Sequence, residues 1–262
     1  MAPKKSLGQN FLHDPNTLAR IVDCANLVPD ATVLEIGAGT GLLTRRLAAN
    51  VGHVIAVEAD ERLKPILEAS LDGYTNVDIH WGDFLKADIM ALVGDKPYSV
   101  VANLPYYITS AIIRKLLEAP NPPTQLIITV QKEVAERILA QPGEMGVLAV
   151  SVQFYGHPEL ISRLKPAVFW PRPEVESAVL RITVYDKPAV DVPDTDLFFR
   201  VVRAGFGQKR KQLKNALAKG LNIRSTQAQA VLEQADIQPS RRAETLALEE
   251  WAALCIAVAQ AT

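Results

Sequence analysis

Apolar and polar positions along the first half of the chain switch repeatedly between the periods of strands and helices. Short apolar runs predict strands, and segments with apolar residues at helical spacing follow most of them. The predicted strands cover residues 31–41, 53–60, 77–85, 98–104 and 124–131, with helices at 42–51, 61–71, 110–119 and 132–140. Because strands that alternate with helices form parallel βαβ units, we expect an α/β fold around a parallel sheet.

The alternation ends after about residue 140. Residues 147–155 and 176–185 are rich in β-branched and aromatic side chains, and we expect them to close the sheet as an antiparallel pair. From about residue 190 the pattern is helical only, with helices predicted at 196–206, 209–221, 226–235 and 248–260. Residues 187–194, with two prolines, are the predicted linker. The sequence therefore predicts two domains, 1–186 with the sheet and 187–262 with helices alone.

Composition narrows the classes of protein that fit. The chain has 262 residues, of which 48% are hydrophobic and 22% charged, as expected for an ordinary folded protein. Cys24, Cys255 and four scattered histidines show no spacing typical of disulfide frameworks or zinc sites, so we expect no metal and a cytoplasmic protein. No apolar stretch is long enough for a membrane span, so membrane functions are excluded.

Charge is distributed unevenly between the two predicted domains. Residues 1–199 carry 18 basic and 24 acidic side chains, whereas residues 200–262 carry 10 basic and 5 acidic ones. Between Arg200 and Arg224 lie eight basic residues and no acidic one. A run of this kind is either a solvated helix face or a surface that binds nucleic-acid phosphates.

A cluster of glycines follows the first predicted strand, in "EIGAGTG". A dinucleotide fingerprint starting at Gly37 would require glycine at position 42, where Leu42 stands, and the GKS or GKT of a P-loop is missing. Either the cluster is a plain tight turn, or Gly37 and Gly39 form the turn typical of methyltransferases that use S-adenosyl-L-methionine (AdoMet). Absent side chains would let such a ligand lie against the backbone.

Two acidic residues at strand ends favour the cofactor interpretation. Glu58 ends the second strand, 21 residues after Gly37, where an acid accepts hydrogen bonds from ribose hydroxyls in this kind of fold. Asp83 ends the third strand and is placed to accept a hydrogen bond from an adenine amine. Each acid alone is compatible with a solvated surface residue, but their order after the glycines indicates a nucleoside site.

The stretch "VVANLPYYIT", residues 100–109, predicts a site for a planar amine. Asn103 offers a side-chain oxygen and Leu104 a backbone carbonyl, which would hold the N–H groups of an aromatic amine and make its nitrogen a better nucleophile. Pro105 fixes the turn, and Tyr106 provides a face on which a base can stack. Tyr107 is as compatible with packing as with substrate contact.

These motifs together resemble the ribosomal RNA adenine N6-dimethyltransferase family, in particular its small-subunit (KsgA/RsmA) branch. The resemblance covers nearly the whole chain. It rests on "KKSLGQNFL" (4–12), "EIGAGTG", "NLPYYI", "VQKEVAERI", "FWPRPEVESAVLRI" (169–182), "FGQKRKQLKNAL" and "RRAETLALEEW". The fold it implies is α/β, a Rossmann-like class I methyltransferase sheet with a small C-terminal all-helical domain.

The resemblance also implies roles for particular residues. It implies AdoMet as cofactor and dimethylation of two adjacent adenosines in a hairpin near the 3′ end of small-subunit rRNA, during late subunit assembly. Phe169 would lie over the flipped base opposite Tyr106, so that the catalytic set is Asn103, Leu104, Pro105, Tyr106 and Phe169. The implied cofactor-binding residues are Gln9, Asn10, Leu12, Gly37, Gly39, Glu58, Asp83 and Asn103. The basic helical domain would contact rRNA through Lys209, Arg210, Lys211 and Lys214. We expect a monomer, because the ribosome supplies the large partner.

Three other functions remain open at this point. A related class methylates large-subunit rRNA and confers macrolide resistance, although "RRAETL" argues against it. A DNA adenine methyltransferase would more usually carry Asp-Pro-Pro-Tyr or Asn-Pro-Pro-Tyr and a larger recognition domain. The protein could also act chiefly as an assembly factor that binds immature small subunits, with catalysis serving its release.

Overall fold

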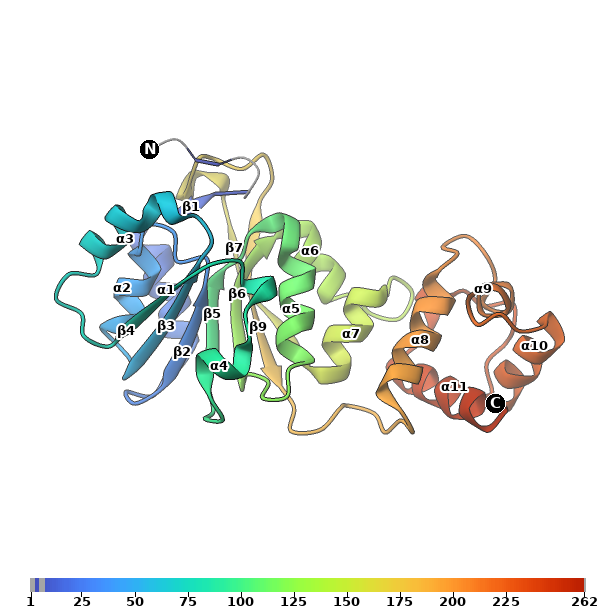
Figure 1. The fold of residues 1–262 in the computed structure, drawn as a ribbon. Helices are drawn as coiled ribbons and strands as arrows, with labels where there is room; N and C mark the ends of the chain where they lie inside the picture. Colours follow the sequence, from blue (N-terminus) through green and yellow to red (C-terminus); the bar gives the residue numbers. More distant parts are fainter. Residues whose placement is uncertain (1–2, 5–7, 262) are drawn as a thin grey trace. The chain divides into compact units, whose positions relative to one another are not determined.

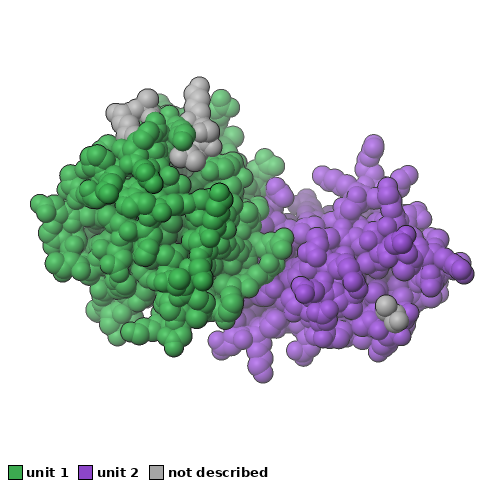
Figure 2. Space-filling view, viewed as in Figure 1, with its two compact units in different colours: residues 1–135, 157–184 green, residues 136–156, 185–262 purple. Residues whose placement is uncertain are grey.

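The computed structural model describes residues 3–4 and 8–261, which form two compact units. Unit 1 contains residues up to 135 and 157–184, and unit 2 contains 136–156 and the residues from 185 onward (Figure 2). The sequence predicted a single domain boundary, after residue 186. The chain instead enters unit 2 twice, at Glu136 and at Tyr185, so residues 136–156 belong with the helices.

Unit 1 is built on a seven-stranded sheet with the strand order β4-β3-β2-β5-β6-β9-β7 (Figure 1). Its strands are β2 (Thr32–Ile36), β3 (His53–Glu58), β4 (Val77–Trp81), β5 (Ser99–Asn103), β6 (Gln125–Gln131), β7 (Gly156–Leu164) and β9 (Ser177–Val184). The pairs from β4 to β6 are parallel, as the alternation predicts, and β9 is antiparallel to β6. A second, two-stranded sheet pairs β1 (Phe11–Leu12) with β8 (Phe169–Trp170).

Helices packed against the sheet complete unit 1. They are α1 (Pro15–Cys24), α2 (Leu42–Ala48), α3 (Lys64–Ser70), α4 (Ile89–Val93), α5 (Thr109–Leu117) and α6 (Lys132–Ile138), whose last residues lie in unit 2. Short 3₁₀ turns lie at η2 (Glu61–Leu63), η3 (Phe84–Lys86), η4 (Tyr106–Ile108) and η5 (Pro166–Val168). The sequence before α1 shows why this helix begins where it does. Asp14 caps it by accepting a hydrogen bond from the Thr17 amide at 2.7 Å, and Pro15 occupies its first position.

The order of the strands decides where a ligand can bind. The chain leaves β2 in one direction along the sheet, to β3 and β4, and later continues on the other side of it with β5 and β6. A crevice therefore opens beyond the carboxyl ends of β2 and β5, which is where ligands bind in open α/β sheets.

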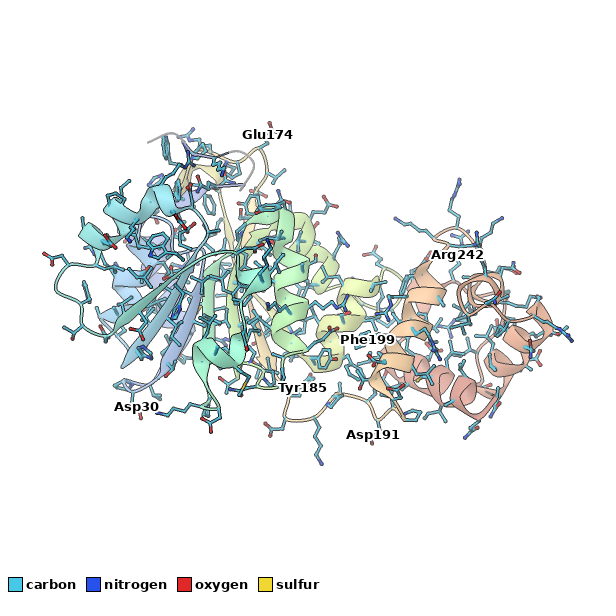
Figure 3. The ribbon with its side chains drawn as sticks, viewed as in Figure 1. Asp30, Glu174, Tyr185, Asp191, Phe199 and Arg242 are labelled. Atoms are coloured by element: carbon cyan, nitrogen blue, oxygen red, sulfur yellow. The ribbon has the colours of Figure 1, made fainter. Side chains whose placement is uncertain are left out.

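Unit 2 contains helices around an aromatic core. They are α7 (Val147–Tyr155), α8 (Thr195–Phe206), α9 (Leu213–Gly220), α10 (Ser225–Gln234), the 3₁₀ turn η6 (Ala243–Thr245) and α11 (Leu248–Ala261). Phe154 of α7 stacks on Phe198 of α8 with ring centroids 4.6 Å apart, and it meets Phe199 edge to face at 5.3 Å. Figure 3 labels Phe199 on α8. These contacts make α7 part of the core of this unit.

Two predictions about this part of the chain were wrong. Residues 147–155 form helix α7, and the strand beside β9 in the sheet is β7, over residues 156–164. Burial on nearly all sides of α7 removes the polar face that marks an amphipathic helix, so its β-branched residues imitate a buried strand. The helix predicted at 209–221 begins only at Leu213, and residues 207–212 connect α8 to α9.

Candidate active site

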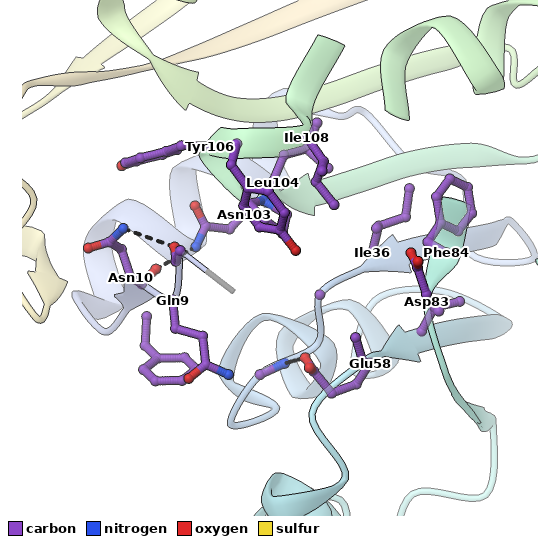
Figure 4. Close-up of a pocket in the computed structure, with 18 of the residues that line it drawn as sticks. Gln9, Asn10, Ile36, Glu58, Asp83, Phe84, Asn103, Leu104, Tyr106 and Ile108 are labelled. Carbon is purple, nitrogen blue, oxygen red and sulfur yellow. Dashed lines mark hydrogen bonds between the residues drawn. The ribbon is translucent and has the colours of Figure 1, made fainter. Parts of the chain in front are cut away.

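A cavity of about 310 Å³ lies at the carboxyl ends of the parallel strands (Figure 4). It is lined by Gly8, Gln9, Asn10, Phe11, Ile36, Gly37, Gly39, Val57, Glu58, Ala59, Gly82, Asp83, Phe84, Asn103, Leu104, Pro105, Tyr106, Tyr107 and Ile108. Segments from four strand ends and from the N-terminal region thus meet in one place. All the predicted catalytic and cofactor-binding residues line it except Leu12 and Phe169.

The glycine turn after β2 forms the floor of this cavity. Gly37 and Gly39 have φ values of 80° and 59°, which side chains rarely tolerate. A Cβ atom on Gly39 would lie 3.1 Å from the Phe11 ring, closer than ordinary packing allows. The turn therefore needs glycine for both its backbone conformation and the approach of Phe11.

Glu58 fixes the shape of the glycine turn from the neighbouring strand. Its carboxylate accepts hydrogen bonds from the Gly39 amide and the Asp60 amide, both at 2.8 Å. The side chain is buried, and burial raises its pKa above the ordinary value despite these bonds. A carboxylate can accept about four hydrogen bonds, so the predicted bond to ribose hydroxyls is compatible with these contacts and stays a prediction.

Asp83 and Phe84 form another wall of the cavity, just after β4. Asp83 is exposed and accepts a hydrogen bond from the Leu85 amide at 3.0 Å, which caps the turn η3. Phe84 is buried and lines the cavity beside it. Sequence reasoning singled out Asp83 alone. An aromatic residue directly after a strand-end acid was the signal that could have identified Phe84.

The N-terminal segment is held at the cavity by hydrogen bonds to residues far from it in the sequence. Gln9 donates a hydrogen bond to Asp60 at 2.8 Å, and hydrogen bonds from Arg62 lower the pKa of Asp60 to about 2. Asn103 donates from its side-chain amide to the Asn10 carbonyl at 2.8 Å. Residues 5–7 of the signature at 4–12 lie outside the described residues.

Asn103 presents an acceptor that no other group among the described residues uses. Since its Nδ2 atom bonds to the Asn10 carbonyl, the amide orientation is set, and its Oδ1 atom is buried without a hydrogen-bond partner among residues 3–4 and 8–261. The next residue, Leu104, donates its amide to the Thr129 carbonyl at 3.2 Å, which ties the turn to β6. A buried acceptor without a partner costs about 1–3 kcal/mol, so the site suits a ligand that donates a hydrogen bond there.

The two tyrosines after Pro105 differ in their surroundings. The Tyr106 hydroxyl lies 2.7 Å from the Ser177 hydroxyl at the start of β9, and burial raises the pKa of Tyr106. Its ring is therefore held in place while it lines the cavity. Tyr107 also lines the cavity, but 58% of its surface is exposed, and its ring covers Gly8.

Leu12 and Phe169 lie together outside the main cavity. They face each other across the β1–β8 pair and belong to one hydrophobic cluster, with exposed fractions of 5% and 1%. In this position Phe169 packs in the core and does not line the cavity that Tyr106 lines, and its predicted contact with the flipped base stays a prediction. Trp170, the next residue, is 53% exposed and stacks on Phe11 with centroids 6.3 Å apart.

The predicted RNA-binding residues lie in unit 2. Lys209, Arg210 and Lys211 are exposed in the connection between α8 and α9, and Lys214 is half-buried in α9. We call residues 209–211 the basic loop. Hydrogen bonds hold both of its ends, from the Lys211 amide to the Gln208 carbonyl at 2.9 Å and from the Leu213 amide to the Arg241 carbonyl at 2.7 Å.

The described residues lack two kinds of feature. Among residues 3–4 and 8–261, no three His, Cys, Asp or Glu side chains gather closely enough to hold a metal ion. None of the helices in the same part of the chain combines the length and apolarity needed to cross a bilayer.

Comparisons with known proteins agree along the whole chain. The family model described as ribosomal RNA adenine dimethylase matches residues 2–254. The chain is 44% identical over 254 residues to the ribosomal RNA small subunit methyltransferase A of Dehalococcoides mccartyi, with 97% of this chain and 87% of that protein covered. It is 46% identical over 262 residues to the protein of the same name from Alkaliphilus metalliredigens, with coverages of 97% and 91%.

Solved structures give the same picture. The crystal structure of the 23S rRNA methyltransferase ErmE matches with a TM-score of 0.74 and 30% identity, covering 96% of this chain and all of that one. A dimethyladenosine transferase from Plasmodium falciparum matches with a TM-score of 0.79 and 24% identity, covering 93% and 95%, which is a likeness of fold. The predicted Rossmann-like methyltransferase fold with a helical C-terminal part is confirmed.

Proposed function

Because the chain belongs to the ribosomal RNA adenine dimethylase family, we propose that it dimethylates the N6 amines of two adjacent adenosines in small-subunit rRNA. The adenosines lie in the hairpin near the 3′ end of that RNA, the methyl donor is AdoMet, and the reaction belongs to late subunit assembly. The observation that carries the proposal is the buried Asn103 Oδ1 atom, which has no hydrogen-bond partner in the described part of the chain and belongs to a cavity-lining residue.

The cavity has features that fit AdoMet, which supplies an electrophilic methyl group on a positively charged sulfur. The glycine turn leaves its backbone free of side chains, and a smaller space of about 30 Å³ beside it is lined by Glu35, Gly37 and Asn103. One oxygen of the buried Glu35 carboxyl accepts no hydrogen bond from the residues that the structure describes. The positive charge of such a ligand would favour the ionised form of Glu35, and Glu58 and Asp83 suit its nucleoside.

The loop after β5 would activate and orient the target amine. The lone pair of an exocyclic amine is delocalised into the ring, so the nitrogen reacts better when acceptors hold its N–H groups. Asn103 Oδ1 accepts from one N–H group and the Leu104 carbonyl from the other. Pro105 restricts the turn directly after them, and Tyr106, held by Ser177, stacks on the base, which is worth about 1–3 kcal/mol.

The substrate must leave its RNA stack to reach this cavity. A base with an accessible N6 amine has to be flipped out, which costs least in a loop or another single-stranded segment. The basic loop would bind backbone phosphates and fix the position of the subunit without reading its sequence. We place this activity in the cytoplasm and assign it to a monomer, because the ribosomal subunit supplies the large partner.

The test is transfer of labelled methyl groups from AdoMet to unmethylated small subunits, followed by nucleoside digestion. We expect label as N6,N6-dimethyladenosine from these particles and none from mature small subunits or large subunits. Label on large subunits would move the protein to the activity named for ErmE. Tight binding of small subunits without label would instead favour an assembly factor without catalysis.

A further inference from the structure

The cavity wall formed by Asp83 and Phe84 depends on a very short element. The turn η3 has three residues, and its own backbone bonds run from the Lys86 amide to the Asp83 carbonyl at 2.9 Å and from the Ala87 amide to the Phe84 carbonyl at 3.2 Å. Isolated 3₁₀ turns have poor hydrogen-bond geometry and little stability of their own. Another group must hold this wall in place.

Lys115 on α5 contacts this turn in three ways. Its ammonium group donates hydrogen bonds to the Leu85 carbonyl at 2.8 Å and to the Ala87 carbonyl at 2.6 Å. The same nitrogen lies 5.5 Å from the centroid of the Phe84 ring, within the range of a cation–π contact. The side chain is half-buried, so solvent competes less for these contacts than at an open surface.

We propose that Lys115 is a positioning residue for nucleoside binding, which sets Asp83 and Phe84 at the cavity. The proposal rests on the proposed function, because it assigns that wall to the adenosine half of AdoMet. Helix α5 begins directly after the turn η4 that contains Tyr106. Lys115 therefore connects the nucleoside wall to the element that follows the catalytic loop.

The experiment compares Lys115→Met with Lys86→Met, its matched control. Lys86 lies in η3 itself and is exposed, so its replacement removes one positive charge at the turn that Lys115 contacts while leaving both carbonyl contacts of Lys115 in place. Calorimetry would measure the affinity of each variant for AdoMet and for 5′-methylthioadenosine, which keeps the nucleoside and lacks the amino-acid part. Methyl transfer at saturating AdoMet would give kcat separately.

We expect Lys115→Met to weaken both ligands about tenfold, since two hydrogen bonds from a charged donor are lost. The kcat should stay within about twofold, because the loop that contains Asn103 is unchanged. Lys115→Arg, which keeps a charged donor, should recover part of the affinity, and Lys86→Met should bind as the unsubstituted chain does.

Several outcomes would overturn this role. Equal affinities in Lys115→Met and Lys86→Met would exclude it, as would a lowered melting temperature with unchanged affinity, which indicates a purely structural residue. Loss of AdoMet binding with normal binding of 5′-methylthioadenosine would place the effect on the amino-acid half and also exclude it. If the unsubstituted chain bound neither ligand, the proposed function itself would fail, which is a distinguishable result.

Discussion

The cavity of unit 1 and the basic loop of unit 2 use polar groups in opposite ways. In and beside the cavity, Glu35, Glu58 and Asn103 are buried or half-buried. Glu58 and Asn103 are held by hydrogen bonds to backbone groups, and Glu35 lies within strand β2. In the loop, residues 209–211 are exposed. Interactions in a buried site are strong and depend on exact placement, whereas exposed charges are screened by salt. Single substitutions should therefore have large effects in the cavity and small, salt-dependent ones in the loop.

The sharpest test of the cavity is Asn103→Ala. It removes the unused Oδ1 acceptor and the bond to the Asn10 carbonyl, so kcat for methyl transfer should fall about 10²–10³-fold, as when an oriented hydrogen-bonding group is lost from other active sites. Binding of unmethylated small subunits should persist, which separates recognition from chemistry. Single-turnover methyl transfer and subunit pull-down would measure the two effects.

Asn50→Ala provides the control for this change. Asn50 is an exposed amide in the same unit, bonded to the Arg46 carbonyl, and it does not line the cavity. Its replacement should leave kcat unchanged. Near-full turnover in Asn103→Ala would show that the acceptor role assigned to Asn103 is wrong.

Glu35 offers a second test of the buried polar groups in unit 1. Burial, with a smaller contribution from the Glu58 carboxylate, raises the pKa of Glu35 from 4.5 to about 8. Between these two pH values the folded chain holds a proton that the unfolded chain releases. The free energy of unfolding should therefore fall as pH rises through this window, by at most about 1.4 kcal/mol per pH unit.

Urea unfolding of unit 1 at pH 6, 7 and 8, followed by Trp81 fluorescence in a Trp170→Phe/Trp251→Phe background, would measure this slope. Glu35→Gln cannot ionise and should flatten the dependence. Asp83→Asn removes an exposed carboxyl from the cavity and should leave the slope in place. An unchanged slope in Glu35→Gln would mean that other groups control the pH dependence of stability.

The sequence predicted the cavity better than it predicted the helical unit, for a physical reason. Strand ends, glycine turns and the Asn-Leu-Pro-Tyr segment are local signals, and a parallel sheet brings its carboxyl ends to one edge. Helix α7 has no such local signal, because the surrounding helices of unit 2 determine its burial and override its β-branched composition.

Contacts between segments far apart in the chain could also not be predicted from the sequence. The bond from Asn103 to Asn10 joins residues 93 positions apart, and Lys115 looks like an ordinary surface lysine of an amphipathic helix. Phe169 is buried and Trp170 is exposed because only one of the two side chains of strand β8 points toward the core. Since neighbouring strand residues point to opposite faces, the motif alone did not fix that choice.

The smallest single-residue effects should come from the basic loop. Replacing Lys209, Arg210 or Lys211 by Ala one at a time should weaken small-subunit binding only a few-fold at moderate salt, because each removes at most one phosphate contact. The diagnostic quantity is the slope of log affinity against log salt concentration. Each replacement that removes a contact should lower its magnitude by about one, and the triple variant should combine the three changes.

Lys187→Ala, which replaces an exposed lysine in the linker, is the matched control. A loss of affinity that is equal at all salt concentrations would mean that the loop acts through fixed, desolvated contacts like those of the cavity, and the contrast between the two regions would then disappear.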